Sequence, residues 1–340
     1  MRRRTFRTAA TTALGVLVLA LVTPAAAARL TGAPVTPSAQ HNVTVNANAT
    51  PGPAAAGATP SATAPPSATA PAPAPSAAAP AREDARAEAA RQPSRSLVAG
   101  RVNLNFTGDF IGYAMLDRHT GELIASRNAA QTSSTESMIK VWLVADHLRR
   151  AAEAGQTVSQ ERLDQASAAI RHSDDRAAQA LYLAGGGNEV VQRMIDICGL
   201  TDTSLYDQWW SRTQMSPRDA VRLAQCVADG TAAGPRWTGW VLSEMRQVTG
   251  STSADEQFAT TGGGRWGIID GVPDTVAGGL AIKNGWTAIG ADSNWHLNCL
   301  AISDDWIMTV MTRYPVENGL QYGADVCASV ARQLVTPPPA

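Results

Sequence analysis

Lysine is nearly absent from this sequence. Of its 28 basic residues only Lys140 and Lys283 are lysines, and all the others are arginines. An arginine stays protonated at any accessible pH, whereas burial or a neighbouring cation can make a lysine amine neutral. The composition therefore indicates that these two positions need an amine. The alternative is that an arginine-rich coding background has left two ordinary surface lysines by chance.

The chain also lacks a strong net charge and a basic stripe. Its formal net charge is −1 at pH 7, so nucleic acid is not an expected partner. The four cysteines, at positions 198, 226, 299 and 327, have no spacing typical of a zinc site. We expect neither a metal nor another cofactor.

Large apolar residues are almost missing from residues 29–96, which are mainly Ala, Pro, Ser, Thr and Gly. Such a segment cannot bury enough surface to offset the entropy of ordering, so we predict a disordered spacer. Before it, four arginines within the first seven residues precede an apolar run at 13–22 and an Ala-rich stretch to residue 28. This is the pattern of a secretory signal peptide, and Arg3-Arg4 also has the form of a twin-arginine signal.

These termini predict an exported protein, either secreted or kept near the cell envelope by its signal and spacer. No cysteine lies near the end of the signal, so we expect no cysteine-linked lipid, and an uncleaved signal acting as an anchor is the alternative. The folded domain is then residues 97–336, long enough for one sizeable core. We expect it to be monomeric.

An even number of cysteines in an exported chain favours two disulfides. Three pairings are possible. We favour Cys198 with Cys226, on neighbouring helices, and Cys299 with Cys327, between a strand and the last helix. Free buried thiols are the alternative.

The order of expected elements predicts an α+β fold. Short apolar runs at 111–117 and 123–127 flank a His-Thr-Gly turn and are typical of a hairpin. Helical spacing follows at 138–154, 163–171, 177–184, 189–197 and 217–228, and strands return at 279–286, 296–302 and 306–314 before a last helix at 323–334. An antiparallel sheet built from the terminal strands, packed with flanking helices and interrupted by an all-helical insertion, accounts for this order.

Ser137 and Lys140 open the first long helix in the pattern Ser-x-x-Lys. Their spacing puts the hydroxyl and the amine on one helix face, one turn apart. The N-terminus of a helix adds free N–H groups and partial positive charge. A neutral lysine there could accept the serine proton and create a nucleophile. The motif alone is weak, because many helices contain it by chance.

Two further motifs stand on suitable elements. Ser173-Asp174-Asp175 lies between two helical stretches, and Lys283-Asn284-Gly285 ends an apolar strand and is followed by Trp286. Such a strand can lay its backbone along a substrate, with Gly285 allowing a close approach and Lys283 supplying positive potential. The local alternatives are a helix cap for the first motif and a strand-end turn for the second.

Together and in this order, the three motifs resemble those of the penicillin-recognising serine hydrolases, which are the serine β-lactamases and the D-alanyl-D-alanine peptidases. The resemblance implies a β-lactamase-like fold. It also implies that Ser137 is acylated with Lys140 as base, and that Ser173, assisted by Lys283, passes a proton to the leaving nitrogen. The N–H groups of Ser137 and Trp286 would form the oxyanion hole.

The sequence departs from that family at several of these positions. Asp175 stands where the family has Asn, and a carboxylate cannot donate to a substrate carbonyl and would keep Lys140 charged. Asn284 replaces Thr or Ser; we expect Asp175, Asn284, Gly285 and Trp286 to contact substrate, with altered recognition of a terminal carboxylate.

Two further departures lie in the spacing and in the omega loop. No Glu occurs between Cys198 and Ser216, where the closest β-lactamases use one for deacylation, and Asp202 or Asp207 could replace it only if the loop folded differently. The 36-residue spacing from Ser137 to Ser173 is shorter than in those enzymes and predicts a more open cleft.

Three interpretations remain open on the sequence. The first is a penicillin-reactive serine hydrolase acting on a cell-wall peptide or a related amide or ester. The second is a β-lactamase of the class A type with an unrecognised deacylating group. The third is a catalytically impaired binding domain with the same fold. The restriction of lysine to positions 140 and 283 argues against the third, because an inactive site has no need to prefer lysine over arginine.

Overall fold

The computed structural model describes residues 102–259 and 262–335. The expected signal peptide and spacer lie outside these residues. The main sheet has the order β2-β1-β8-β7-β5, with β6 also paired to β7, and every pairing is antiparallel. Its strands are β1 (Phe110–Asp117), β2 (Leu123–Ala125), β5 (Ala281–Ile282), β6 (Gly285–Ile289), β7 (Asn294–Ile302) and β8 (Trp306–Pro315). The first strand, β1, therefore pairs with the last strand, β8, in one sheet, as predicted.

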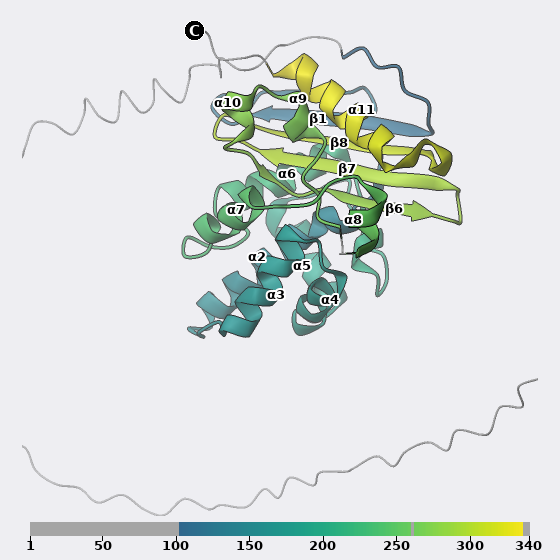
Figure 1. Ribbon diagram of the computed structural model, residues 1–340. Helices are drawn as coiled ribbons and strands as arrows, with labels where there is room; N and C mark the ends of the chain where they lie inside the picture. Colours follow the sequence, from purple (N-terminus) through teal and green to yellow (C-terminus); the bar gives the residue numbers. More distant parts are fainter. Residues whose placement is uncertain (1–101, 260–261, 336–340) are drawn as a thin grey trace, which may run out of the picture. The chain divides into compact units, whose positions relative to one another are not determined.

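Helices cover both faces of this sheet (Figure 1). On one face lie α11 (Gly319–Leu334) and α9 (Ile268–Gly271). The other face meets α6 (Pro217–Ala228) and the helical region that stands between β2 and β5 in the sequence. The central strands β7 and β8 are consequently buried along almost their whole length, as expected for strands covered on both sides.

The helical region includes the predicted helices as α2 (Lys140–Glu153), α3 (Gln160–Arg171), α4 (Asp175–Ala184) and α5 (Asn188–Cys198). Sequence analysis did not identify α7 (Thr238–Arg246), α8 (Ala254–Ala259), α10 (Asp274–Ala277) or the small sheet of β3 (Ser133–Ser134) and β4 (Gln214–Met215). These elements are short, and a periodic pattern is weak over so few residues. The remaining pieces are the 3₁₀ turns η1 (Glu136–Ile139), η2 (Trp210–Arg212) and η3 (Val316–Asn318).

Local signals explain where α6 begins. The Ser216 hydroxyl accepts a hydrogen bond from the Asp219 N–H at 3.2 Å, and Pro217 occupies the first helical position. Both features are typical of a helix N-terminus, because the cap fills a free N–H and proline has none to lose. The helix predicted at 217–228 is confirmed.

The strand predicted at 279–286 is the clearest local correction. It is divided into β5 and β6, with Lys283 and Asn284 between them. The Lys283 N–H still donates to the Leu300 carbonyl at 3.1 Å, so pairing with β7 survives the interruption. At this break both side chains are buried: Lys283 contacts Ser173, and Asn284 contacts the Gly264 carbonyl.

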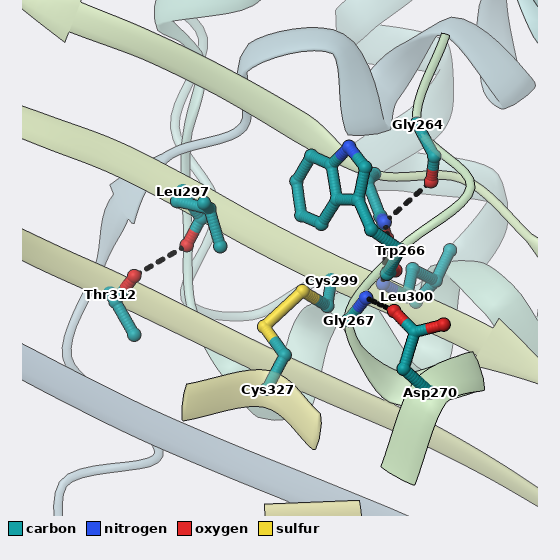
Figure 2. The surroundings of a disulfide bond; sticks show 10 residues. Gly264, Trp266, Gly267, Asp270, Leu297, Cys299, Leu300, Thr312 and Cys327 are labelled. Atoms are coloured by element: carbon teal, nitrogen blue, oxygen red, sulfur yellow. Dashed lines mark hydrogen bonds between the residues drawn. A yellow bond between two sulfur atoms is a disulfide. The ribbon is translucent and has the colours of Figure 1, made fainter. Parts of the chain in front are cut away.

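Both predicted disulfides are present. Cys198 joins α5 to α6 through Cys226, and Cys299 joins β7 to α11 through Cys327, with Cα–Cα distances of 5.6 and 6.4 Å. Figure 2 shows the second bond beside Gly267. A Cβ on Gly267 would lie 2.7 Å from the Cys299 sulfur, and its φ of +88° also favours glycine.

Among residues 102–259 and 262–335, no helix is long and apolar enough to cross a membrane.

Candidate active site

A cleft of about 820 Å³ lies where η1, α4, η2 and β6 meet. Four of the predicted site residues line it, together with aromatic and polar side chains from the helical region. The lining residues are Glu136, Ser137, Ser173, Asp175, Arg176, Gln179, Ala180, Leu183, Trp209, Trp210, Ser211, Gln257, Trp286 and Thr287. The tertiary structure thus brings all three sequence motifs to one place.

Ser137 stands in the tight turn η1, immediately before α2. The turn is closed by the Met138 N–H, which donates to the Thr135 carbonyl at 3.1 Å. The preceding residue, Glu136, has a φ of +48°, which is unusual for a residue with a side chain. Strained backbone of this kind often occurs at functional sites, and here it precedes a serine that is half-buried in the cleft.

Gly285 allows β6 to approach this turn closely. A Cβ on Gly285 would lie 2.5 Å from the Met138 nitrogen and 2.7 Å from the Ser137 nitrogen. No side chain fits there. The predicted need for glycine is explained by the approach of the serine turn itself.

Ser173 lies between the two lysines. Its hydroxyl oxygen is 3.2 Å from the Lys140 Nζ and 2.9 Å from the Lys283 Nζ. Its φ of +56° turns the carbonyl toward Lys140 as well, and Lys140 donates to that oxygen. All three side chains are buried. One hydroxyl therefore connects the only two amines that lysine supplies in this chain.

Asp174 and Asp175, which follow Ser173 in the middle motif, have different partners. The Asp174 carboxylate accepts from the Ala177 N–H at 2.7 Å and caps α4, so the local helix-cap interpretation holds for this residue. Asp175 instead pairs with Lys140, with 2.6 Å between Oδ1 and Nζ. The side chain of Asp175 is 77% exposed and that of Lys140 is fully covered.

The contacts of Lys140 occupy all three of its ammonium hydrogens. They point to the Ser173 carbonyl, the Ser173 hydroxyl and the Asp175 carboxylate. The ammonium also lies 5.4 Å from the centre of the Trp210 ring, a cation–π arrangement. Burial lowers the pKa of Lys140, and Asp175 opposes that shift. Asp175 thus favours the charged amine, as the sequence predicted.

Lys283 has a different environment. Its amine contacts the Ser173 hydroxyl and the Asn284 carbonyl, neither of which carries a charge. Burial lowers the pKa of Lys283 well below its ordinary value, and the nearby charge of Lys140 lowers it further, against a weaker opposing effect of Asp175. This lowering favours the neutral amine, which is the form of a lysine that can accept a proton.

The predicted contact between Asn284 and substrate is not supported by its position. Asn284 is buried, and its amide nitrogen donates to the carbonyls of Gly264 and Trp266 at 2.8 and 2.7 Å. Its amide oxygen accepts from the Leu300 N–H at 3.3 Å. The side chain holds neighbouring backbone together. A strand-end pattern could not reveal this, because the partners are distant in sequence.

Trp286 does reach the cleft. Its ring is half-buried and packs edge-on against Trp266, with 5.1 Å between centroids, and its indole N–H donates to Gln257 Oε1 at 2.9 Å. Trp209, which is 54% exposed, lies at another part of the cleft. The walls therefore offer aromatic surface, which suits a substrate with apolar or planar groups.

Neither of the two omega-loop carboxylates considered above lines the cleft. Asp202 accepts hydrogen bonds from Ser216 and from the guanidinium of Arg218. Asp207 accepts from the Asn188 amide at 2.7 Å. Both carboxylates hold the loop in place, and the carboxylates that do line the cleft are Glu136 and Asp175.

Sequence analysis missed Glu136. An acidic residue beside the start of a helix is ordinarily a favourable partner of the helix dipole, so nothing in the pattern marked it. In the structure it is only 2% exposed, and its carboxyl contacts the hydroxyls of Ser134 and Thr287 at 2.6 Å each.

The described residues contain no cluster of three or more His, Cys, Asp or Glu side chains able to hold a metal ion.

Part of this chain is similar in sequence to known proteins. Residues 162–258 match a model of the β-lactamase enzyme family. This match includes Ser173 and Asp175 but neither Ser137 nor either lysine. Curated relatives are the proteins of Mycobacterium bovis and Mycobacterium tuberculosis named "Putative lipoprotein LppW". They are 29% identical over 216 residues, which are 62% of this chain and 65% of theirs. The chain thus spans less than two thirds of the length of these relatives.

Solved structures share the fold. TLA-3 extended-spectrum β-lactamase has a TM-score of 0.54 at 15% identity, covering 67% of this chain and 94% of its own. An ancestral class A β-lactamase has a TM-score of 0.51 at 19% identity, covering 67% and 94%. A β-lactamase from Desulfarculus baarsii has a TM-score of 0.50 at 16% identity, covering 74% and 96%. The chain has the β-lactamase fold, and its residues 162–258 are similar to the β-lactamase enzyme family.

Proposed function

We propose that this protein is an exported serine hydrolase that forms an acyl-enzyme at Ser137. The observation that carries the proposal is the position of the Ser173 hydroxyl between the Lys140 and Lys283 amines, in the same cleft as Ser137. A chain that otherwise uses arginine has buried its two lysines at this point. Burying two amines without paired carboxylates for both is costly, and a chemical role explains why they are buried nonetheless.

The proposed chemistry uses these groups in sequence. The Ser137 oxygen attacks the carbonyl carbon of an amide or ester, and its proton passes to Lys140 once that amine is neutral and released from Asp175. The Ser137 and Trp286 N–H groups receive the oxyanion, a contribution typically worth a few kcal/mol. The carbon–nitrogen bond of an amide, or the carbon–oxygen bond of an ester, then breaks as Ser173 gives its proton to the leaving atom. Ser173 is reprotonated through the lysines. Water later hydrolyses the Ser137 ester.

Cleft shape supports a peptide or a small molecule as the substrate. The cleft opens beside half-buried and exposed aromatic rings, and Arg176 lies on its wall. A cell-wall peptide, which combines apolar side chains with carboxylates, fits such a surface. We propose that the signal and spacer bring the domain to the envelope, by the twin-arginine or the general route. Two disulfides support an oxidising compartment.

Slow deacylation follows from the same site. A class A β-lactamase hydrolyses its ester with the help of an omega-loop carboxylate, and here Asp202 and Asp207 are held by Arg218 and Asn188. We therefore propose a penicillin-reactive hydrolase that holds its acyl group, rather than a fast β-lactamase.

One observation favours a second candidate, a binding domain without turnover. Lys140 already has three acceptors, and Ser137 is not one of them. If Asp175 never releases the amine, Ser137 has no base and the cleft only binds.

Labelling with a fluorescent penicillin, and separately with a fluorophosphonate, distinguishes these candidates. We expect a stable covalent label on the wild type, located at Ser137 by mass spectrometry, and no label on Ser137→Ala. Fast turnover of the penicillin would identify a β-lactamase instead. An unlabelled wild type that still binds the penicillin would support the binding domain, and undiminished labelling of Ser137→Ala would exclude Ser137 as the nucleophile.

A further inference from the structure

A row of short hydrogen bonds runs from the cleft to the surface beside the serine turn. Asp292 Oδ2 and His296 Nε2 are 2.7 Å apart, and His296 Nδ1 and the Ser134 hydroxyl are 2.7 Å apart. Ser134 and Glu136 are 2.6 Å apart, as are Glu136 and the Thr287 hydroxyl. The Thr287 hydroxyl is also 2.7 Å from the Trp286 carbonyl. The row thus contains five contacts, each of which needs one proton.

Counting protons fixes how the row is filled. Each hydroxyl supplies one, and Asp292 and the Trp286 carbonyl only accept. The remaining three must come from the His296 ring and the Glu136 carboxyl. The ring supplies at most two, so all five contacts are satisfied only when Glu136 also carries a proton. With an ionised Glu136, one pair of oxygens near 2.7 Å has no hydrogen between them.

The direction of each bond then follows. With all five contacts satisfied, the His296 ring donates to Asp292 and to the Ser134 oxygen, and Ser134 donates to Glu136. A Glu136 carboxylic acid donates to Thr287, the reverse of the direction that Thr287 takes toward an ionised carboxylate, and Thr287 donates to the Trp286 carbonyl. In this order the protonated carboxyl of Glu136 links the turn that holds Ser137 to β6, the strand that carries Trp286.

Charges around Glu136 come from three elements. His296 on β7 and Arg212 on η2 favour its ionised form, and Lys140 on α2 has an electrostatic interaction with it. β6 contributes no charged residue. Hydrogen bonds donated by the Ser134 and Thr287 hydroxyls also favour the ionised form. Burial is the largest effect, and it raises the pKa of Glu136 above its ordinary value. A neutral carboxyl also avoids placing a negative charge beside the groups that would receive an oxyanion.

We infer that Glu136 is a positioning residue, whose protonated carboxyl fastens the Ser137 turn to β6 and whose ionisation loosens it. The effect on reactivity rests on the proposed function, whereas the protonation of Glu136 can be measured without any activity. Glu136→Gln reproduces the proposed acid, because the amide can donate to Thr287 and its oxygen can accept from Ser134. Glu136→Ala removes both contacts. Thr287→Val removes the hydroxyl that Glu136 contacts and keeps the shape of the side chain.

The first measurement is the carboxyl ¹³C resonance of Glu136 in the full chain, assigned by its disappearance in Glu136→Gln and followed against pH. We expect Glu136 to remain protonated where ordinary glutamates, with pKa values of about 4.3, have ionised. Thr287→Val should lower its ionisation pH, and Thr287→Ser should restore it. Ionisation with the ordinary glutamates, unaffected by Thr287→Val, would overturn the inference.

The second measurement is the rate of covalent labelling against pH, with melting temperature as a control for folding. Glu136→Gln should retain the low-pH labelling rate and lose the decline that accompanies ionisation in the wild type. Thr287→Val should label about tenfold more slowly, the size expected for one lost hydrogen bond. Glu136→Ala loses two contacts and should label at least as slowly.

Unchanged labelling rates and pH profiles in all three variants would overturn the positioning role even if Ser137 is labelled. If the wild type is not labelled but Glu136 still ionises at a higher pH than ordinary glutamates, the proposed function is overturned. The hydrogen bond between a protonated Glu136 and Thr287 is then still supported.

Discussion

The floor of the cleft and its omega-loop wall use charged residues in opposite ways. On the floor, Lys140 and Lys283 converge on the Ser173 hydroxyl. On the wall, Asp202 accepts from Arg218 and Ser216 and does not line the cleft. The two lysine amines of the floor share a hydroxyl through which a proton can pass. The carboxylate of Asp202 is instead held by hydrogen bonds to Arg218 and Ser216. The floor therefore holds groups suited to forming an acyl-enzyme. Neither Asp202 nor Asp207 of the omega loop lines the cleft, where a carboxylate could help to hydrolyse the acyl-enzyme.

The largest expected effect is on the floor, at Lys140. Lys140→Ala and Lys140→Arg should both reduce the labelling rate by about 10²–10⁴-fold, the usual contribution of a general base, because neither offers a neutral amine at working pH. Asp175→Asn should raise the rate, because it removes the carboxylate that favours the ammonium. Stopped-flow acylation with a fluorescent penicillin measures all three. Substantial labelling by Lys140→Arg would show that Lys140 acts only as a fixed cation.

The two disulfides test how each region is supported. Cys198–Cys226 holds the start of the wall loop to α6, and Cys299–Cys327 holds β7 to α11, away from the wall. Replacing either pair by alanines should lower the free energy of unfolding by about 2–4 kcal/mol, measured by urea denaturation. Losing Cys198–Cys226 should also loosen the loop, seen as faster amide exchange there, while losing Cys299–Cys327 should not. Equal exchange in both variants would mean that the bond does not define the wall.

A third effect concerns pH and Lys283. Because its pKa is lowered in the folded state, the unfolded chain binds more protons between the folded pKa and the ordinary value of about 10.4. Stability from this group is therefore full at high pH and falls as pH drops toward the folded pKa, by about 1.4 kcal/mol for each pH unit that separates the two pKa values. Lys283→Met, which stays apolar at every pH, should flatten the dependence of the free energy of unfolding on pH. An equally steep profile in Lys283→Met would assign it to other groups.

The smallest expected effect is on the wall. Asp202→Asn should leave the lifetime of the acyl-enzyme unchanged, because the carboxylate faces Arg218 rather than the cleft. It should lower the free energy of unfolding by about 1 kcal/mol or less, as for a partly exposed ion pair. Asp207→Asn is the matched control. A markedly longer acyl-enzyme lifetime in either variant would show that the wall does take part in deacylation.

Much of this site could be predicted from the sequence. Lysine scarcity singled out Lys140 and Lys283, and the Ser-x-x-Lys spacing placed Ser137 at the start of the first long helix. The helix α6 and the strand β8 were also predicted correctly, because α6 has a periodic apolar face and β8 a continuous apolar run typical of a strand covered on both sides. The cysteine pairs followed from the expected neighbours of each element.

Other features depended on contacts between residues far apart in the chain. Asn284 was expected to meet substrate, and instead its amide is used by Gly264 and Trp266. Glu136 carried no signal, because its role depends on hydroxyls at positions 134 and 287.

By itself, the sequence determined the class of the fold, because composition and periodicity limit what each segment can bury. It also favoured the cysteine pairing that the structure has and singled out the two lysines. The tertiary structure alone decided which amine meets Asp175, which side chains line the cleft and which hold backbone in place. The physical reason is that a pKa and a hydrogen bond belong to an environment, and that environment is made by segments that only folding brings together.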